Sequence, residues 1–138
     1  MGTISENRYR LRKNDKVVGY MRKVGRQSYF YSRDAFWWTG RAINYDEIDE
    51  WTGLYDKNRT PIYEWDIIHF KIDPDGDYCV GVILWQEDQE RFVIRKVDDD
   101  LYFPLFLEEL QLFDQRQLEV FSYLFLNPDL KHYLGIDD

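Results

Sequence analysis

Closely spaced turn signals cut this sequence into short segments, and that spacing limits what the chain can fold into. Residues 8–13 (RYRLRK) alternate apolar and basic side chains, which is the period of a half-buried strand. The pairs Asn14-Asp15 and Gly25-Arg26 are turn signals, and an Asp-Pro-Asp-Gly-Asp loop occupies residues 73–77. Segments of this length predict a mainly β fold with about seven to nine short strands.

The expected strands share apolar alternation or a high content of Val, Ile and aromatic residues. They cover residues 8–13, 16–24, 27–32, 36–45, 51–59, 62–72, 78–86, 91–97 and 119–126. Residues 46–50 predict a bend or a helical turn, and residues 101–114 fit either a bulged strand or a short helix. One helix start is clear, because Asn127 is a good N-cap, Pro128 suits the first helical position and Gly135 is a natural stop.

The chain length sets the expected domain organisation. With 138 residues, the chain has the size of one ordinary domain. Its 5 Trp, 11 Tyr and 9 Phe favour strands further, because aromatic rings pack well on a pleated surface. We expect a single domain over residues 1–138, with a disordered terminus at 1–7, an N-terminal β region at 8–50 and a core at 51–134.

A single cysteine, Cys79, constrains the compartment and the chemistry. It excludes an intramolecular disulfide and a cysteine-based zinc site, which fits a reducing compartment. The N-terminus is polar and charged, and no apolar stretch is long enough to cross a bilayer. We therefore expect the protein to stay in the cytoplasm of the cell that makes it.

Charge is distributed unevenly along the chain. Residues 1–34 contain nine Lys/Arg and three Asp/Glu, a charge of +6, whereas residues 35–138 contain nine Lys/Arg and 23 Asp/Glu, a charge of -14. Arg8, Arg10 and Arg12 fall on one face of the first expected strand, and tyrosines follow nearby in the sequence. Such a face indicates either basic strands against acidic neighbours of the same fold or a surface for single-stranded nucleic acid. The overall acidity favours the first interpretation.

Residues of the catalytic and metal-binding types occur without a recognisable pattern. His69, His132 and Cys79 stand in no metal or nucleophile spacing, so we interpret them as structural. The alternating Asp73, Asp75 and Asp77 lack the glycine position and the glutamate of a calcium loop. No phosphate loop, nucleophile elbow or HExxH motif occurs. We expect no cofactor, no metal and no enzymatic activity.

Two adjacent tryptophans, Trp37 and Trp38, are candidate contact residues. Neighbouring strand residues point to opposite faces of a sheet, so one of the two indoles is expected at the surface. There it is either an anchor for a protein partner or tucked under a loop.

Residues 51–70 read WTGLYDKNRTPIYEWDIIHF, and this stretch is similar to a known family. It resembles the signature of the YopX family, in which an aromatic-Thr-Gly-Leu stretch leads through Asp-Lys-Asn-Gly into Ile-Tyr-Glu-Gly-Asp-Ile. The matching positions are Trp51, Thr52, Gly53, Leu54, Asp56, Lys57, Asn58, Ile62, Tyr63, Glu64, Asp66 and Ile67. A Gly-Val-Ile strand at residues 81–83 that leads to Trp85, and a Glu-Val strand before Asn-Pro at residues 119–130, agree with the family as well.

The resemblance is strongest over residues 51–134. It implies a phage or prophage protein with a small β-rich domain that contains a barrel, and it brings no activity with it. Within the motif, Tyr63, Glu64, Trp65 and Asp66 are candidate binding residues. Glu64 and Asp66 share one face if they are strand residues, where they either hold a cation or, as we favour, accept backbone hydrogen bonds.

This chain departs from the family signature at two glycine positions. Arg59 replaces the Gly after Asn58, so that turn either carries strain or adopts a different type. Trp65 replaces the Gly before Asp66. If that Gly serves the close approach of another backbone, Trp65 does not allow it, and we expect the ring to cover a surface pocket instead.

The expected fold is thus mainly β, a small SH3-like or YopX-like β-barrel with additional N-terminal strands and a short C-terminal helix. Residues 62–97 provide the barrel core, in which Gly81 permits sharp coiling of its strand.

The leading hypothesis is a non-enzymatic module that binds an unknown protein partner. That partner is a host protein or a second copy of the chain, and the acidic surface suits a basic host protein. The alternative is a nucleic-acid-associated module that uses the basic N-terminal strands, and the second alternative is an enzyme without a recognisable signature.

Overall fold

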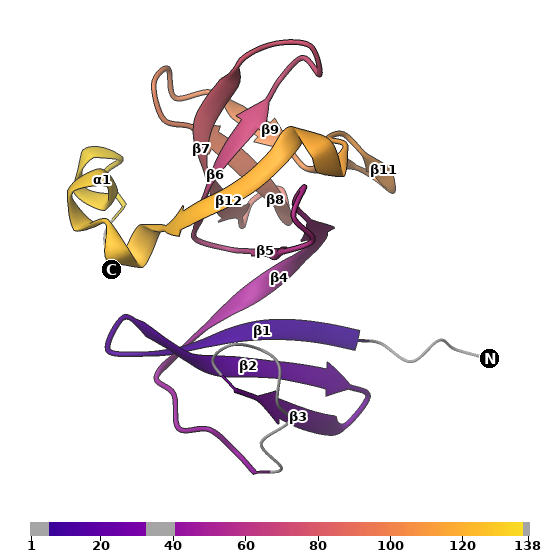
Figure 1. Cartoon of the computed structure of the whole chain (residues 1–138), viewed down its shortest axis with the longest axis vertical. Helices are drawn as coiled ribbons and strands as arrows, with labels where there is room; N and C mark the ends of the chain where they lie inside the picture. Colours follow the sequence, from indigo (N-terminus) through magenta and orange to yellow (C-terminus); the bar gives the residue numbers. More distant parts are fainter. Residues whose placement is uncertain (1–5, 33–40, 137–138) are drawn as a thin grey trace. The chain divides into compact units, whose positions relative to one another are not determined.

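The computed structural model describes residues 6–32 and 41–136 as a mainly β protein built from antiparallel sheets (Figure 1). The chain divides into two compact units, Met1–Trp51 and Thr52–Asp138. No helix within the described ranges combines the length and the apolar character that a membrane span needs.

The first unit is a sheet with the strand order β3-β2-β1-β4. Its strands are β1 (Glu6–Lys13), β2 (Lys16–Val24), β3 (Gln27–Tyr31) and the first part of β4 (Glu47–Tyr55). The turn between β1 and β2 is formed by Asn14 and Asp15, both with positive φ (53° and 60°), the conformation that a two-residue hairpin requires.

The bend or helical turn expected at residues 46–50 is wrong, because the structure has a strand from residue 47. Residues 47–50 pair antiparallel with β1, from Tyr9 opposite Glu50 to Arg12 opposite Glu47. This pairing holds the backbone of the acidic segment in an extended conformation. β1 begins at Glu6 rather than at the expected Arg8. Trp37 and Trp38, and with them the first half of the strand expected at residues 36–45, lie outside the described residues, and residues 41–45 do not form the strand expected there.

The second unit contains a five-stranded antiparallel sheet with the order β12-β6-β7-β8-β9 and a small hairpin, β10-β11. The strands of the larger sheet are β6 (Asp66–Lys71), β7 (Tyr78–Gln86), β8 (Arg91–Lys96), β9 (Tyr102–Pro104) and β12 (Leu118–Tyr123). The remaining elements are β5 (Pro61–Tyr63), which pairs with β4, β10 (Phe106–Leu107), β11 (Leu110–Gln111), the 3-10 turns η1 (Gln115–Gln117) and η2 (Leu124–Leu126), and the helix α1 (Pro128–Tyr133).

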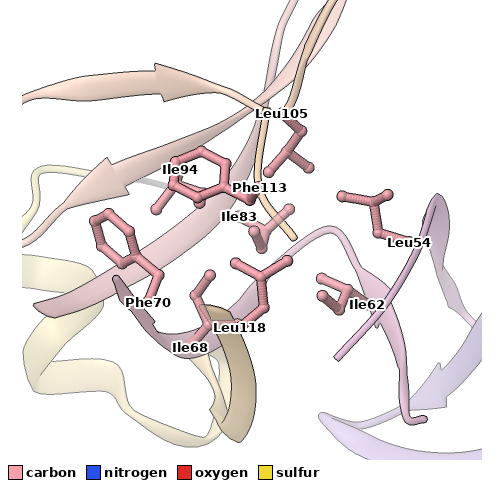
Figure 2. Close-up of a cluster of buried hydrophobic side chains, with 9 residues drawn as sticks. All are labelled: Leu54, Ile62, Ile68, Phe70, Ile83, Ile94, Leu105, Phe113 and Leu118. Carbon is pink, nitrogen blue, oxygen red and sulfur yellow. The ribbon is translucent and has the colours of Figure 1, made fainter. Parts of the chain in front are cut away.

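The core of this unit is a cluster of nine buried apolar side chains that converge in Figure 2. They are Leu54, Ile62, Ile68, Phe70, Ile83, Ile94, Leu105, Phe113 and Leu118. A second cluster contains Ile67, Val82, Leu124 and Leu134. Because Ile67 and Ile68 are adjacent in β6, the two clusters occupy opposite faces of the sheet.

Gly81 has a packing role in the centre of this sheet. A β-carbon at this position would collide with the side chains of Ile94 and Phe70, two members of the core cluster. Its φ is not positive, so close packing explains the glycine better than the sharp coiling that the sequence suggested.

The expected closed barrel is not confirmed, because within residues 41–136 the larger sheet is open, with β12 and β9 at its edges. The free edge of β12 instead bonds to the turn between β4 and β5. Lys57 donates its backbone N–H to Leu118 O, and the backbone N–H of Val120 donates to the Asp56 carboxylate. At the other edge, β9 is three residues long and ends in Pro104, which has no N–H to donate. Neither edge therefore offers the ladder that closure needs.

Asn127 precedes α1 but does not cap it with its side chain. Its amide donates to Tyr123 O at 2.6 Å and to Ser122 Oγ at 2.9 Å, so it closes the turn before the helix. This corrects the capping role expected from the sequence. Gly135, at φ 70°, ends the helix, and its N–H donates to His132 O.

Both positions at which the chain departs from the family's glycines have positive φ, 65° at Arg59 and 75° at Trp65. The backbone has therefore kept the conformation that glycine adopts freely. At Arg59 it is held by the N–H of Arg59, which donates to Asp56 O at 2.9 Å. At Trp65 the N–H donates to Ile83 O, and the carbonyl accepts from Leu124 N.

Replacing Arg59 by glycine should stabilise the protein by up to about 1 kcal/mol, because glycine removes the left-handed strain although it adds unfolded-state entropy. Thermal and urea unfolding measure the effect. Thr60→Gly, in the same turn and without positive φ, is the matched control and should lower stability. A stability loss in Arg59→Gly as large as in the control would show that the arginine side chain outweighs the strain.

Candidate functional site

Two of the three candidate arginines of the first strand are buried. Arg10 and Arg12 are 1% and 7% exposed, and both bind the fully buried carboxylate of Asp49 in β4. Arg10 Nε donates to Asp49 Oδ2 at 2.7 Å, and Arg12 Nη2 donates to Oδ1 at 2.8 Å. The expected alternation along the strand is present, but these guanidinium groups form an internal ion cluster. The third arginine, Arg8, lies over the ring of Trp51 at 4.8 Å.

The four candidate residues of the family motif form the connection between β5 and β6. Tyr63 is buried at the end of β5, and its N–H donates to the buried Asp66 carboxylate at 2.8 Å. Asp66 thus accepts a backbone hydrogen bond, as we favoured. Glu64 lies in the turn, so it does not share a strand face with Asp66 as expected. Trp65 packs against the cluster that contains Ile67 and Val82.

Asp56, another residue of the family signature, is 1% exposed and organises the turn before β5. Its Oδ1 accepts from the N–H groups of Asn58 and Thr60, and its Oδ2 accepts from Val120 N, each at 2.9 Å. Asp56 and Asp66 therefore bond to the backbone of the fold itself.

An open groove of about 520 Å³ lies between the ends of two hairpins of the second unit. One wall is the turn that joins β7 to β8, and the other is the β10-β11 hairpin; β7, β8 and β11 are labelled in Figure 1. The lining residues are Thr52, Trp85, Gln89, Glu90, Arg91, Phe92, Phe106, Leu107 and Glu108. Trp85 is 37% exposed and Leu107 is 51% exposed, so the groove presents apolar surface to solvent.

The tryptophan of the groove is held in one orientation. Trp85 stands opposite Phe92 in the β7–β8 ladder, and the two rings meet edge to face at 4.8 Å. The indole Nε1–H donates to Glu87 Oε2 at 2.8 Å. An exposed aromatic ring that is already ordered loses little entropy on binding, which favours it as a contact residue.

The second wall is anchored through the residues that flank it. Leu105 and Phe113, just before β10 and just after β11, belong to the core cluster. Leu105 N donates to Phe92 O at 3.2 Å, and Leu112 N donates to Leu105 O at 3.0 Å. The core therefore fixes the position of Leu107 relative to Trp85 and Phe92.

The segments that bound the groove are rich in carboxylates, of which Glu90 and Glu108 line it. Residues 85–92 and 106–109 contain Glu87, Asp88, Glu90, Glu108 and Glu109 against a single cation, Arg91, a formal charge of -4. Arg91 Nε donates to Gln86 Oε1 at 3.2 Å. Glu90 and Glu108 have positive φ, 51° and 57°, a conformation that disfavours any residue except glycine, asparagine or aspartate.

A separate polar cluster lies on the large sheet, on the face opposite the core cluster. His69 stacks on Phe121 with ring centroids 4.0 Å apart, and its Nδ1 lies 3.5 Å from Glu119 Oε1. Lys57 Nζ lies 3.3 Å from Glu119 Oε2, and its hydrogen bond holds the pKa of Glu119 below its usual range. The pKa of Lys57 is raised by the same hydrogen bond.

In the part of the chain that the structure describes, His, Cys, Asp and Glu side chains nowhere gather in the threes that a metal site needs. Cys79 packs against the core cluster, and His132 is exposed on α1.

Sequence reasoning did not identify the groove. It noted Trp85 only as a landmark of the family, and it left the β10-β11 region ambiguous between strand and helix. The available signal was the apolar-Glu-Glu-apolar run at residues 106–110, in which two adjacent carboxylates interrupt an apolar segment.

The sequence model of one protein family, described as YopX protein, matches residues 7–130. The match covers nearly the whole chain and reaches well before residue 51, where the resemblance in the sequence begins to be strong. No curated protein matches the chain.

The Asp49 cluster predicts a large effect of a small change. Asp49→Asn leaves two buried guanidinium groups without their carboxylate and should destabilise the first unit by about 3 kcal/mol. Urea unfolding and amide hydrogen exchange in β1 measure it. The exposed neighbour Glu50→Gln should change stability by less than about 0.5 kcal/mol, and equal effects of the two variants would contradict a buried ion cluster.

The lowered pKa of Glu119 predicts a pH dependence of stability. A carboxylate whose pKa is lower in the folded state stabilises fully above its unfolded pKa, about 4.3, and this contribution is lost as the pH falls through the folded value. Glu119→Gln should therefore flatten the fall in unfolding midpoint below about pH 4.3. An unfolding midpoint that falls as steeply in the variant as in the wild type would contradict a stabilising Lys57–Glu119 hydrogen bond.

Proposed function

The chain belongs to the YopX family, and we propose that it acts as a non-enzymatic protein-binding module whose binding site is the groove between the β7–β8 turn and the β10-β11 hairpin. The family resemblance to phage and prophage proteins makes a protein in the bacterial cytoplasm the partner we propose.

One observation carries the proposal: an ordered aromatic ring and a half-exposed leucine face the same open groove. Protein interfaces concentrate their binding energy in a few aromatic and apolar anchors, surrounded by polar groups that exclude water. Trp85 and Leu107 have the properties of such anchors, and Gln89, Glu90 and Glu108 have those of such a rim.

The geometry gives less support to nucleic acid. Arg10 and Arg12, which the alternative required at the surface, are occupied by Asp49. Two carboxylates line the groove and three more lie in the turns that bound it, and these charges repel phosphate.

Selection from a random displayed peptide library tests the proposed function. Peptides enriched on the wild-type protein should lose at least about tenfold in affinity for Trp85→Ser/Leu107→Ser, the usual loss when central anchors are removed. They should bind unchanged to Leu126→Ser/Tyr133→Ser, which removes two exposed apolar side chains of η2 and α1. Thermal unfolding establishes that both variants are folded, and Leu107→Ser alone serves if the double variant is not.

Equal binding of the enriched peptides to wild type and to Trp85→Ser/Leu107→Ser would contradict the proposed site. Retention of single-stranded DNA or RNA by the wild type in filter binding at physiological salt would favour the nucleic-acid alternative instead.

A further inference from the structure

We infer, building on the proposed function, that the groove takes a segment of a partner protein that carries arginine or lysine, with the cation placed between Trp85 and the carboxylates of the rim. Protein binding defines the site, and the inference concerns the chemistry of what enters it.

The charges around the groove are complementary to a basic ligand. Glu90 and Glu108 line the groove, and the two turns that bound it also contain Glu87, Asp88 and Glu109; the side chains of residues 87–90 and 108–109 are all exposed. The cation in the lining, Arg91, donates to Gln86. The lining itself has a formal charge of -1, and the two segments that bound it, residues 85–92 and 106–109, have a formal charge of -4. This negative surface repels an acidic segment and attracts a basic one, and it raises the rate of encounter with such a partner.

The aromatic lining is the second argument. An arginine or lysine side chain is an apolar stem with a cationic head, so it suits a groove that has an aromatic wall and an acidic rim. Trp is the best ring for a cation–π contact, and Trp85 is fixed by Phe92 and by its hydrogen bond to Glu87. That hydrogen bond also places a carboxylate beside the indole, so the ring and the negative charge act on the same ligand group.

The backbone of the rim agrees with this assignment. Glu90 and Glu108 have left-handed φ, where glycine would be less strained, yet both carry carboxylates and both line the groove. Strained backbone is enriched at functional sites, and the two strained residues of this groove both present a carboxylate to it. Replacing Glu108 by glycine should therefore raise the unfolding midpoint while it weakens binding, a combination that loss of folding cannot produce.

Synthetic peptide mixtures that are identical except at one fixed position test the inference directly. The fixed residue is arginine, its neutral isostere citrulline, or glutamate. The arginine mixture should bind the wild type about tenfold more tightly than the citrulline mixture, the glutamate mixture should bind weakest, and the difference should shrink as salt is added. Glu90→Gln/Glu108→Gln should abolish most of the arginine advantage, whereas Asp75→Asn/Asp77→Asn, with the same change in net charge in an exposed loop, should preserve it.

The outcomes separate this inference from the proposed function. Equal binding of the arginine and citrulline mixtures, with both lost in Trp85→Ser/Leu107→Ser, would overturn the cationic ligand and leave the groove as a protein-binding site. Binding that ignores Trp85 and Leu107 altogether would overturn both. Self-association of the wild type that disappears in Glu90→Gln/Glu108→Gln would make a second copy of the chain the occupant and would overturn a separate partner.

Discussion

Three backbone N–H groups converge on the buried carboxylate of Asp56, and most of the second unit is arranged around this contact. Two of the three belong to the turn that follows Asp56, and the third belongs to β12, 64 residues further along the chain. The carbonyl of Asp56 also accepts from Gln115 Nε2. A buried carboxylate without its three donors would be strongly destabilising, so the turn and β12 stabilise each other through Asp56. Because this contact occupies the edge of β12, the sheet ends there instead of closing into a barrel.

The family signature and the candidate binding surface are therefore different parts of the molecule. Asp56 and Asp66, the buried carboxylates of the signature, bond to backbone amides, and Thr52 donates its hydroxyl to Ile62 O. These residues support the fold of the chain whatever it binds. The groove instead depends on two short hairpin ends, which can change without disturbing the core. The match to the family therefore leaves the ligand open.

The sequence predicted the elements whose stability is local. The bounds expected for β2 and β7 are those observed, because each is a β-rich run ended by a turn signal. The sequence did not predict features that need a distant partner. Arg10 is buried because Asp49, 39 residues away, is brought beside it by β4. The β10-β11 hairpin turns at Glu108-Glu109, which lacks the glycine or asparagine that marks such a turn. Neither the hydrophobic periodicity nor the family signature predicted the groove, because the groove lies between the ends of two hairpins.

The central claim is that a cationic segment binds the acidic groove through Trp85 and Leu107. The most direct measurement is a titration of the isotope-labelled wild-type protein with an arginine-containing peptide, followed through the backbone amide and indole resonances in NMR spectra. The account predicts that the resonances that shift lie in residues 85–92 and 106–109, with the Trp85 indole N–H among the largest changes because its hydrogen bond to Glu87 is disturbed. Shifts that centre on β12 and α1, or on the strands of the first unit, while the Trp85 indole resonance stays in place would contradict it.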